Sequence, residues 1–146
     1  MSRILIFLLL MAALPAAAQN GLNVSPVFER YAAGKKQVNA ITLKGDKVAN
    51  YQLSLFRSIT YPAQYNEAWN VEKLIQLDAK AAINQESAMK NGQLYYGFFQ
   101  LPARGGVNRY LFYRNNSLQR NSSATAILIY MEGTASIDQL KRTFGK

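Results

Sequence analysis

The 146-residue chain contains neither histidine nor cysteine. Their absence excludes the Ser–His–Asp and Cys–His arrangements of nucleophilic enzymes and removes the usual ligands of zinc and copper sites. Without cysteine the chain also forms no disulfide and carries no reactive thiol, so its stability must come from packing alone. We therefore expect no metal site and no cofactor.

Acidic residues are also scarce, with 8 aspartates and glutamates against 17 lysines and arginines. None of the carboxylates forms a close pair within a motif, and the sequence has no P-loop, dinucleotide-binding glycine pattern or EF-hand loop. Glu132 and Asp138, which flank the start of the last predicted helix, are expected to cap it. Asp78 falls beside the apolar stripe of another predicted helix, where we expect a helix-edge residue rather than a catalytic base. The sequence thus favours a protein that is not an enzyme.

The N-terminus has the three parts of a secretory signal peptide. Arg3 supplies the positive charge, Ile4–Leu14 is apolar, and the small residues that a signal peptidase requires precede Gln19. The apolar run is shorter than the ~20 residues of a membrane-spanning helix, which disfavours a retained anchor. We expect residues 1–18 to be removed by cleavage between Ala18 and Gln19.

The remaining chain, residues 19–146, is long enough for one domain with its own core. Loss of Arg3 with the signal peptide lowers the net charge from +9 to +8, which favours anionic partners. An exported protein meets acidic glycans and anionic lipid headgroups more often than nucleic acid, although the charge can also serve solubility alone. No second apolar run of spanning length occurs, so we expect a periplasmic or secreted protein with no transmembrane segment after signal removal.

Apolar periodicity predicts an α+β domain of about five mostly antiparallel strands, in the order α-β-β-α-β-β-β-α, with helices packed on the sheet. The predicted helices cover residues 26–33, 67–82 and 137–144, and the predicted strands cover residues 37–44, 51–61, 93–101, 107–114 and 124–132. Asn66 is expected to cap the long helix, Thr134 or Ser136 the last one, and Pro102 to end its strand. Residues 84–90 fit either a helical extension or a loop.

The most apolar stretch after the signal, Ala124–Gly133, carries β-branched and aromatic residues at both strand parities. Such a strand is buried on both faces and belongs in the middle of a sheet. The two preceding strands are also apolar at both parities, so both faces of the sheet need cover, which three helices can supply. If all helices pack on one face, the other exposes an aromatic patch suited to a partner or a homo-oligomer. That patch would contain either Tyr96, Phe98, Tyr110 and Phe112, or Tyr95, Phe99 and Tyr113.

Arginines alternate with tyrosines between residues 95 and 120, a mixture that can bind ligands by stacking and charge. Strand alternation divides this set, because Arg109 and Arg114 are five residues apart and point to opposite faces of a regular strand. Arg109 is expected to share a face with Tyr113, and Arg114 with Tyr110. The candidate binding residues are Arg104, Arg109, Arg114, Tyr96, Tyr110 and Tyr113.

Two segments, Phe28–Tyr31 and the strand-to-helix run Ile129–Leu140, together with the signal peptide, carry a family resemblance. The chain resembles families of small exported proteins of unknown function from Bacteroides-type, Gram-negative bacteria. The resemblance implies a cell-envelope location and an α+β domain. It transfers no catalytic residues, because none are established for such families.

These observations favour an exported, soluble, non-enzymatic domain that binds another component of the cell envelope, either a protein or an acidic glycan or lipid surface. One alternative is an enzyme that uses aspartate, glutamate, tyrosine or lysine on an envelope glycan, which requires two carboxylates in one cleft. The other is a basic domain that binds polyanions or anionic lipids.

Overall fold

The computed structural model describes residues 21–31, 37–120 and 122–144. The predicted signal peptide and its cleavage position between Ala18 and Gln19 lie outside these residues. Within the described part, no helix is both long enough and apolar enough to cross a membrane.

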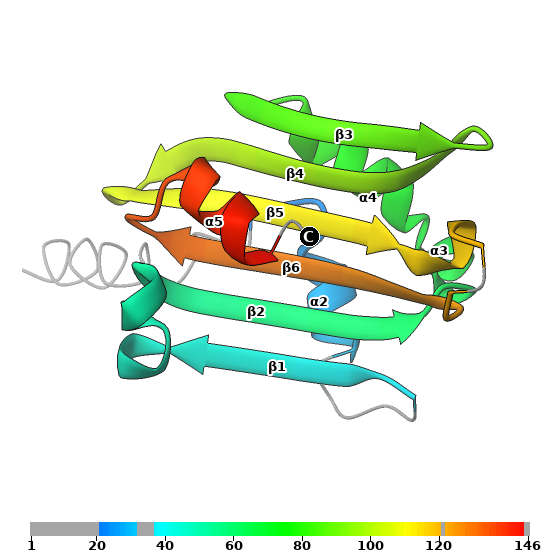
Figure 1. Cartoon of the computed structure of the whole chain (residues 1–146), viewed down its shortest axis with the longest axis horizontal. Coiled ribbons are helices and arrows are strands. Elements are labelled where there is room, and N and C mark those ends of the chain that lie inside the picture. Colours follow the sequence, from blue (N-terminus) through cyan, green and yellow to red (C-terminus); the bar gives the residue numbers. More distant parts are fainter. Residues whose placement is uncertain (1–20, 32–36, 121, 145–146) are drawn as a thin grey trace, which may run out of the picture.

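The centre of the fold is one antiparallel sheet of six strands in the order β1-β2-β6-β5-β4-β3 (Figure 1). The strands are β1 (Asn39–Lys44), β2 (Leu53–Pro62), β3 (Asn84–Lys90), β4 (Gln93–Arg104), β5 (Val107–Asn115) and β6 (Thr125–Gly133). This arrangement confirms the α+β class and the antiparallel pairing, and it adds one strand to the five expected.

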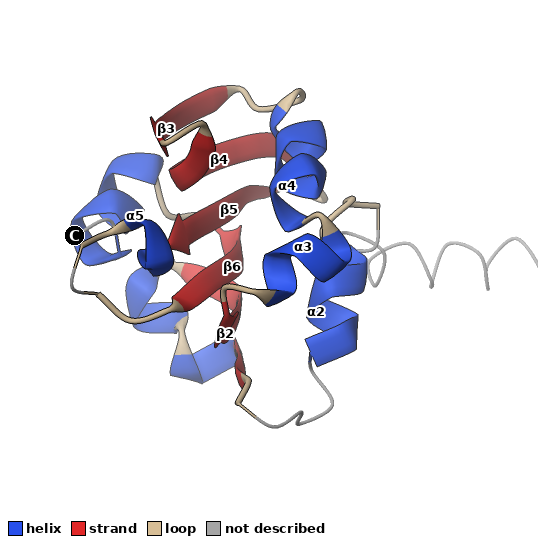
Figure 2. Ribbon diagram, turned by 90° about the vertical axis from the view of Figure 1, so that its right-hand side faces the viewer, coloured by secondary structure: helices blue, strands red, loops and turns tan. Residues whose placement is uncertain are grey.

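Helices lie on both faces of this sheet (Figure 2). They are α2 (Ser25–Tyr31), α3 (Tyr65–Trp69), α4 (Val71–Ala79) and α5 (Ile137–Phe144), with short 3-10 turns at η2 (Gly45–Lys47), η3 (Ala49–Tyr51) and η4 (Asn116–Leu118). The first three helices cover one face, here called the α2–α4 face, and the last covers the opposite, α5 face. The expected bounds of the last helix, 137–144, are confirmed.

Strand β6 lies between β2 and β5, as its apolar sequence predicts. Leu128 and Tyr130 belong to the core beneath α2 and α4, whereas Ile129 and Met131 belong to the core beneath α5. Because side chains alternate between the two faces of a strand, this one segment contributes residues to two separate hydrophobic cores. Both faces need cover, and the helices supply it.

The same division accounts for the aromatic residues of β4 and β5. Phe98, Tyr110 and Phe112 are buried beneath α5, and Phe99 and Tyr113 are buried on the other face. The sequence left open whether one face would stay bare. A bare aromatic face at these positions is not found, because α5 packs opposite the other three helices.

Strand β3 occupies residues 84–90, where the sequence suggested a helical extension or a loop. All seven of its residues are exposed, so no apolar alternation marks it. It is an edge strand held by backbone pairing with β4, for example Gln85 opposite Phe99. Edge strands of this kind owe their conformation to a neighbour rather than to their own side chains.

The long helix expected at 67–82 is two helices. Asn70 separates α3 from α4 with a left-handed backbone, φ 50° and ψ 49°. Asparagine is one of the few residues that tolerate this conformation. Asn66 lies inside α3 and its side chain bonds two tyrosine hydroxyls, so it does not cap the helix.

Pro102 does not end its strand, because β4 continues to Arg104 with a register shift between Leu101 and Arg104. A proline is tolerated in a strand at such a bulge, where the backbone ladder is already interrupted. The expected first strand begins two residues late, at Asn39, and Tyr51 belongs to η3 rather than to β2.

The step from β6 into α5 holds a close backbone contact. The N–H groups of Thr134 and Ala135 both donate to the carbonyl oxygen of Gln52, at 3.0 Å each. A Cβ on Gly133 would lie 2.6 Å from the Cα of Leu53, so a side chain does not fit there. Ser136 then caps α5: its hydroxyl accepts from the Gln139 N–H and its own N–H donates to the Gln139 side chain.

Candidate functional site

The structure divides the arginines and tyrosines selected from the sequence between the two sheet faces. Arg109 and Tyr113 lie on the α2–α4 face, because they share the parity of Leu111 in that core. Tyr96, Tyr110 and Arg114 lie on the α5 face with Phe112. Arg104 is exposed at the hairpin end of β4. These residues therefore form no continuous binding surface.

Several members of the set have structural partners. The buried Tyr110 hydroxyl donates to the carbonyl oxygen of Ala135, and the Arg109 Nε donates to the carbonyl oxygen of Pro102 at 2.9 Å. The Arg114 guanidinium lies 5.4 Å from the centre of the Tyr96 ring, a cation–π arrangement. These contacts hold the sheet and its helices together.

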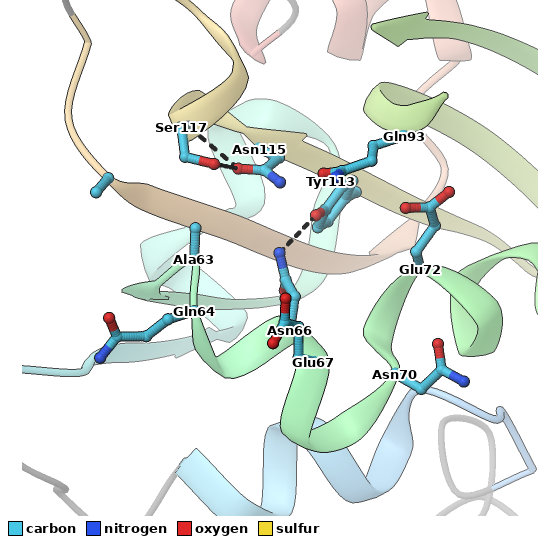
Figure 3. A pocket seen from close by; sticks show the side chains of 11 residues that line it. Ala63, Gln64, Asn66, Glu67, Asn70, Glu72, Gln93, Tyr113, Asn115 and Ser117 are labelled. Atoms are coloured by element: carbon cyan, nitrogen blue, oxygen red, sulfur yellow. Dashed lines mark hydrogen bonds between the residues drawn. The ribbon is translucent and has the colours of Figure 1, made fainter. Parts of the chain in front are cut away.

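A polar pocket of about 460 Å³ lies elsewhere, where α3 and the start of α4 meet the ends of β2 and β5 (Figure 3). Helical residues form one wall, strand-end and η4 residues the other. The polar residues among them are Gln64, Asn66, Glu67, Asn70, Glu72, Gln93, Tyr113, Asn115 and Ser117. Of the residues selected from the sequence, only Tyr113 takes part.

A chain of hydrogen bonds fixes the back of the pocket. The Tyr61 hydroxyl donates to Asn66 Oδ1 at 2.6 Å, and Asn66 Nδ2 donates to the Tyr113 hydroxyl oxygen at 2.9 Å. The Tyr113 oxygen thus accepts from a fixed partner. Its own proton can be donated to a ligand in the pocket.

Burial raises the pKa of the Tyr113 hydroxyl from its ordinary value of 10.0 to about 12. The negative charge of Glu72 raises this pKa further, while hydrogen bonding from Asn66 and Asn115 opposes the shift. The hydroxyl is therefore protonated at neutral pH. It serves the pocket as a neutral hydrogen-bond donor and not as a base.

Asn115 fixes the local structure of the opposite wall of the pocket. Its Oδ1 accepts hydrogen bonds from the Ser117 N–H, at 3.1 Å, and from the Ser117 hydroxyl. This local bonding shapes η4 at the end of β5. It also leaves the amide nitrogen of Asn115 directed away from Ser117 (Figure 3), and the Asn115 side chain is hydrogen-bonded to the Tyr113 hydroxyl.

Two carboxylates, Glu67 and Glu72, line the same pocket, and its described lining contains no lysine or arginine. No group of three or more acidic, histidine or cysteine side chains able to hold a metal ion occurs among the described residues. The pocket therefore offers acceptors and neutral donors with a negative bias. This is the hydrogen-bonding pattern that complements hydroxyl, amide and amine groups.

The spacing of Glu67 and Glu72 in the sequence did not indicate that they line one pocket. On one continuous helix, positions five residues apart project in different directions. The left-handed Asn70 lies between Glu67 and Glu72 and changes the direction of the chain. The run of asparagine, glutamine and glutamate at residues 64–72 was the available signal, and its polarity is equally typical of an exposed loop.

Other carboxylates differ from their expected roles. Glu132 lies in β6 and accepts a hydrogen bond from the Tyr130 hydroxyl at 2.7 Å, so it does not cap α5. Asp78 is buried rather than at the helix edge. Its oxygens accept from the backbone N–H groups of Asn23 and Val24 and from the Asn23 side chain. Asp138 lies in the first turn of α5, but the capping hydrogen bonds there are made by Ser136 and Gln139.

Comparison with known proteins gives one match. A protein-family model described as a family of unknown function (DUF6108) matches residues 11–144. No curated protein and no solved structure matches the chain. The protein therefore belongs to the DUF6108 family.

Proposed function

We propose that this protein is an exported, non-enzymatic binding domain of the cell envelope, and that its ligand is a neutral or amine-bearing glycan held in the polar pocket. Residues 1–18 act as the signal peptide in this proposal. The observation that carries it is the lining of the pocket, which combines two carboxylates with amides and a fixed tyrosine hydroxyl.

The ligand class follows from the charges of the lining. Sugar hydroxyls donate to the oxygens of Glu67 and Glu72 and accept from amide nitrogens and the Tyr113 hydroxyl. An acidic sugar would instead meet two glutamates with no lysine or arginine in the described lining to balance them. The positive charge of the chain as a whole therefore does not define the ligand of this pocket.

Hydrolysis of a glycan is the second candidate, because Glu67 and Glu72 line one pocket. Glycosidases use two carboxylates, one of them a protonated acid in apolar surroundings. Glu67 is exposed and Glu72 is half-buried, so neither side chain is enclosed in that way. Binding without turnover is the better supported activity.

Titration of the processed protein, purified after export, with a panel of neutral, amine-bearing and acidic oligosaccharides tests the ligand class. We expect binding to neutral or amine-bearing members, weakened about tenfold or more in Glu67→Gln/Glu72→Gln and in Tyr113→Phe, because each change removes a hydrogen bond to the ligand. Asp138→Asn, which removes a carboxylate on the α5 face, is the matched control. Equal binding by all three variants would contradict the assignment of the pocket.

The same incubations separate binding from hydrolysis. We expect each bound oligosaccharide to be recovered intact. Shortened products that disappear in both Glu67→Gln and Glu72→Gln would favour the enzyme. Determining the N-terminal residue of the purified protein tests export independently: Gln19 is expected, and an intact N-terminal segment would contradict the signal-peptide assignment.

A further inference from the structure

The α5 face of the sheet is covered unevenly. In Figure 1, α5 lies in front of β5 and β6, whereas β1 has only the short η2 and η3 turns at one end. Ile41 and Leu43 of β1 point to this face, because Leu43 pairs with Phe56, which packs against the core beneath α5. In this strand Ile41 is therefore exposed, whereas Leu43 packs at the margin of the core beneath α5.

Aromatic residues extend this surface toward α5. The Phe144 ring, in the last turn of α5, lies 5.5 Å from Phe56 and 6.3 Å from Tyr51, measured between ring centres. Ile41 is 42% exposed and Tyr51 is 51% exposed, while the others are half-buried. We call these five residues, Ile41, Leu43, Tyr51, Phe56 and Phe144, the edge patch.

Positive charges adjoin the edge patch. Lys47 lies in η2 four residues before Tyr51, and Arg142 precedes Phe144 by two residues, both exposed. Asp46 is the acidic residue on the same segment. Among the described residues the ion pair found is between Lys141 and Glu86, so it uses neither of these cations. The surroundings of the patch thus carry an excess of positive charge.

A second copy of the chain is a poor occupant of this patch. A stable interface buries about 800 Å² on each partner, and three of the five patch residues are already half-buried. Two copies related by symmetry would also place lysines and arginines against each other. An anionic surface satisfies both the apolar and the charged parts of the patch.

We propose that the edge patch docks this protein on an anionic lipid bilayer. Tyr51 and Phe144 enter the headgroup region, where amphipathic and aromatic rings are favoured, and Lys47 and Arg142 contact lipid phosphates. The polar pocket, whose Tyr113 lies on the α2–α4 face, then points away from the membrane. The docking is independent of what that pocket binds.

Sedimentation of the processed protein with vesicles of phosphatidylcholine, alone or mixed with phosphatidylglycerol, tests the charged part. We expect binding to the mixed vesicles that weakens as salt rises. Lys47→Gln/Arg142→Gln should weaken it by roughly fivefold per charge removed. Lys73→Gln/Lys80→Gln removes the same charge from exposed positions of the α4 segment and is the matched control, expected to retain nearly full binding.

A second pair of variants tests the apolar part. Ile41→Ser/Tyr51→Ser should weaken vesicle binding by about tenfold or more, because it removes the exposed apolar area of the patch. Ile83→Ser/Met89→Ser changes residues that are 65% and 53% exposed near β3, and should leave binding unchanged. Each substitution lies on the surface, so the fold is expected to survive.

Three results would overturn the proposal. Equal binding to neutral and anionic vesicles would exclude charge recognition. Equal losses in the control variants would show that the patch is not the docking site. A dimer in analytical ultracentrifugation that Ile41→Ser/Tyr51→Ser dissociates would identify a second copy as the occupant.

Discussion

At the scale of single residues, Asp78 connects two helices that are far apart in the sequence. Its carboxylate, at the end of α4, accepts hydrogen bonds of 2.7 and 2.8 Å from the backbone and side-chain nitrogens of Asn23 and of 3.0 Å from the Val24 N–H. These groups precede α2. A buried carboxylate is stable only when it is hydrogen-bonded in this way, so Asp78 holds α2 against α4.

Replacing Asp78 with asparagine should lower the free energy of unfolding by about 2 to 3 kcal/mol, because one amide group cannot accept all three hydrogen bonds and its NH₂ faces other donors. Urea denaturation measures the loss. Asp138→Asn, at an exposed position in the first turn of α5, should cost less than about 1 kcal/mol. Equal losses in the two variants would show that the Asp78 contacts contribute no more than a surface charge.

The buried tyrosines are expected to make the folded state less stable at alkaline pH. Burial raises the pKa of Tyr113 to about 12, and burial also raises the pKa of Tyr61 and of Tyr130. In the unfolded chain a tyrosine ionises near its ordinary value of 10.0. Between these values the folded state retains protons that the unfolded state has lost, so the stabilisation is complete below pH 10 and is lost as the pH rises toward about 12.

For Tyr113 alone this loss amounts to about 2 to 3 kcal/mol. We expect urea denaturation at rising pH to show a decline above pH 10 that is shallower in Tyr113→Phe by this amount. Tyr51→Phe removes the hydroxyl of an exposed tyrosine and serves as the control. An identical decline in Tyr113→Phe would show that folding does not raise the pKa of this hydroxyl above that of the unfolded chain.

At the scale of elements, the segments that pack by their own side chains were predicted and those that depend on a neighbour were not. Strand β6 and helix α5 were predicted because their apolar residues recur with the period of a strand or a helix. Strand β3 has exposed side chains throughout and was missed. The break between α3 and α4 was missed as well, because asparagine occurs in helices and in left-handed conformations alike, so Asn70 by itself does not mark a break.

Asn70 sets the angle between α3 and α4 by its left-handed backbone. Asn70→Ala should cost about 1 kcal/mol, because a Cβ without a bonding side chain is disfavoured in that conformation. Asn70→Gly should be close to neutral, since glycine adopts the conformation without strain. Thermal or urea denaturation of the two variants checks the difference. Equal stability of Ala and Gly at this position would mean that the two helices straighten into one.

At the scale of the whole molecule, the pocket could not be predicted from the sequence because no single segment contains it. Glu67 and Glu72 come from the helices, Tyr113 and Asn115 from the end of β5, and Gln93 from the start of β4. Each is an ordinary polar residue in its own segment. Sheet topology brings them together, whereas strand parity alone was enough to separate Arg109 from Arg114.

The positive net charge of the molecule predicts how its stability depends on salt. The sequence has 17 basic and 8 acidic residues, and the ion pair found among the described residues joins Lys141 and Glu86 at 2.7 Å. Like charges in excess repel within the compact state, and salt screens this repulsion over about 8 Å at physiological ionic strength. We expect the free energy of unfolding to rise by on the order of 1 kcal/mol between low and physiological sodium chloride.

Urea denaturation across sodium chloride concentrations measures this rise. Lys73→Glu/Lys80→Glu reverses two exposed charges and should both stabilise the protein at low salt and reduce its salt dependence, because it lowers the positive excess. Lys73→Arg/Lys80→Arg keeps the charge and should leave the salt dependence unchanged. A free energy of unfolding that falls as salt rises would show instead that attractive pairs dominate the surface, which would also weaken the case for an anionic membrane as its partner.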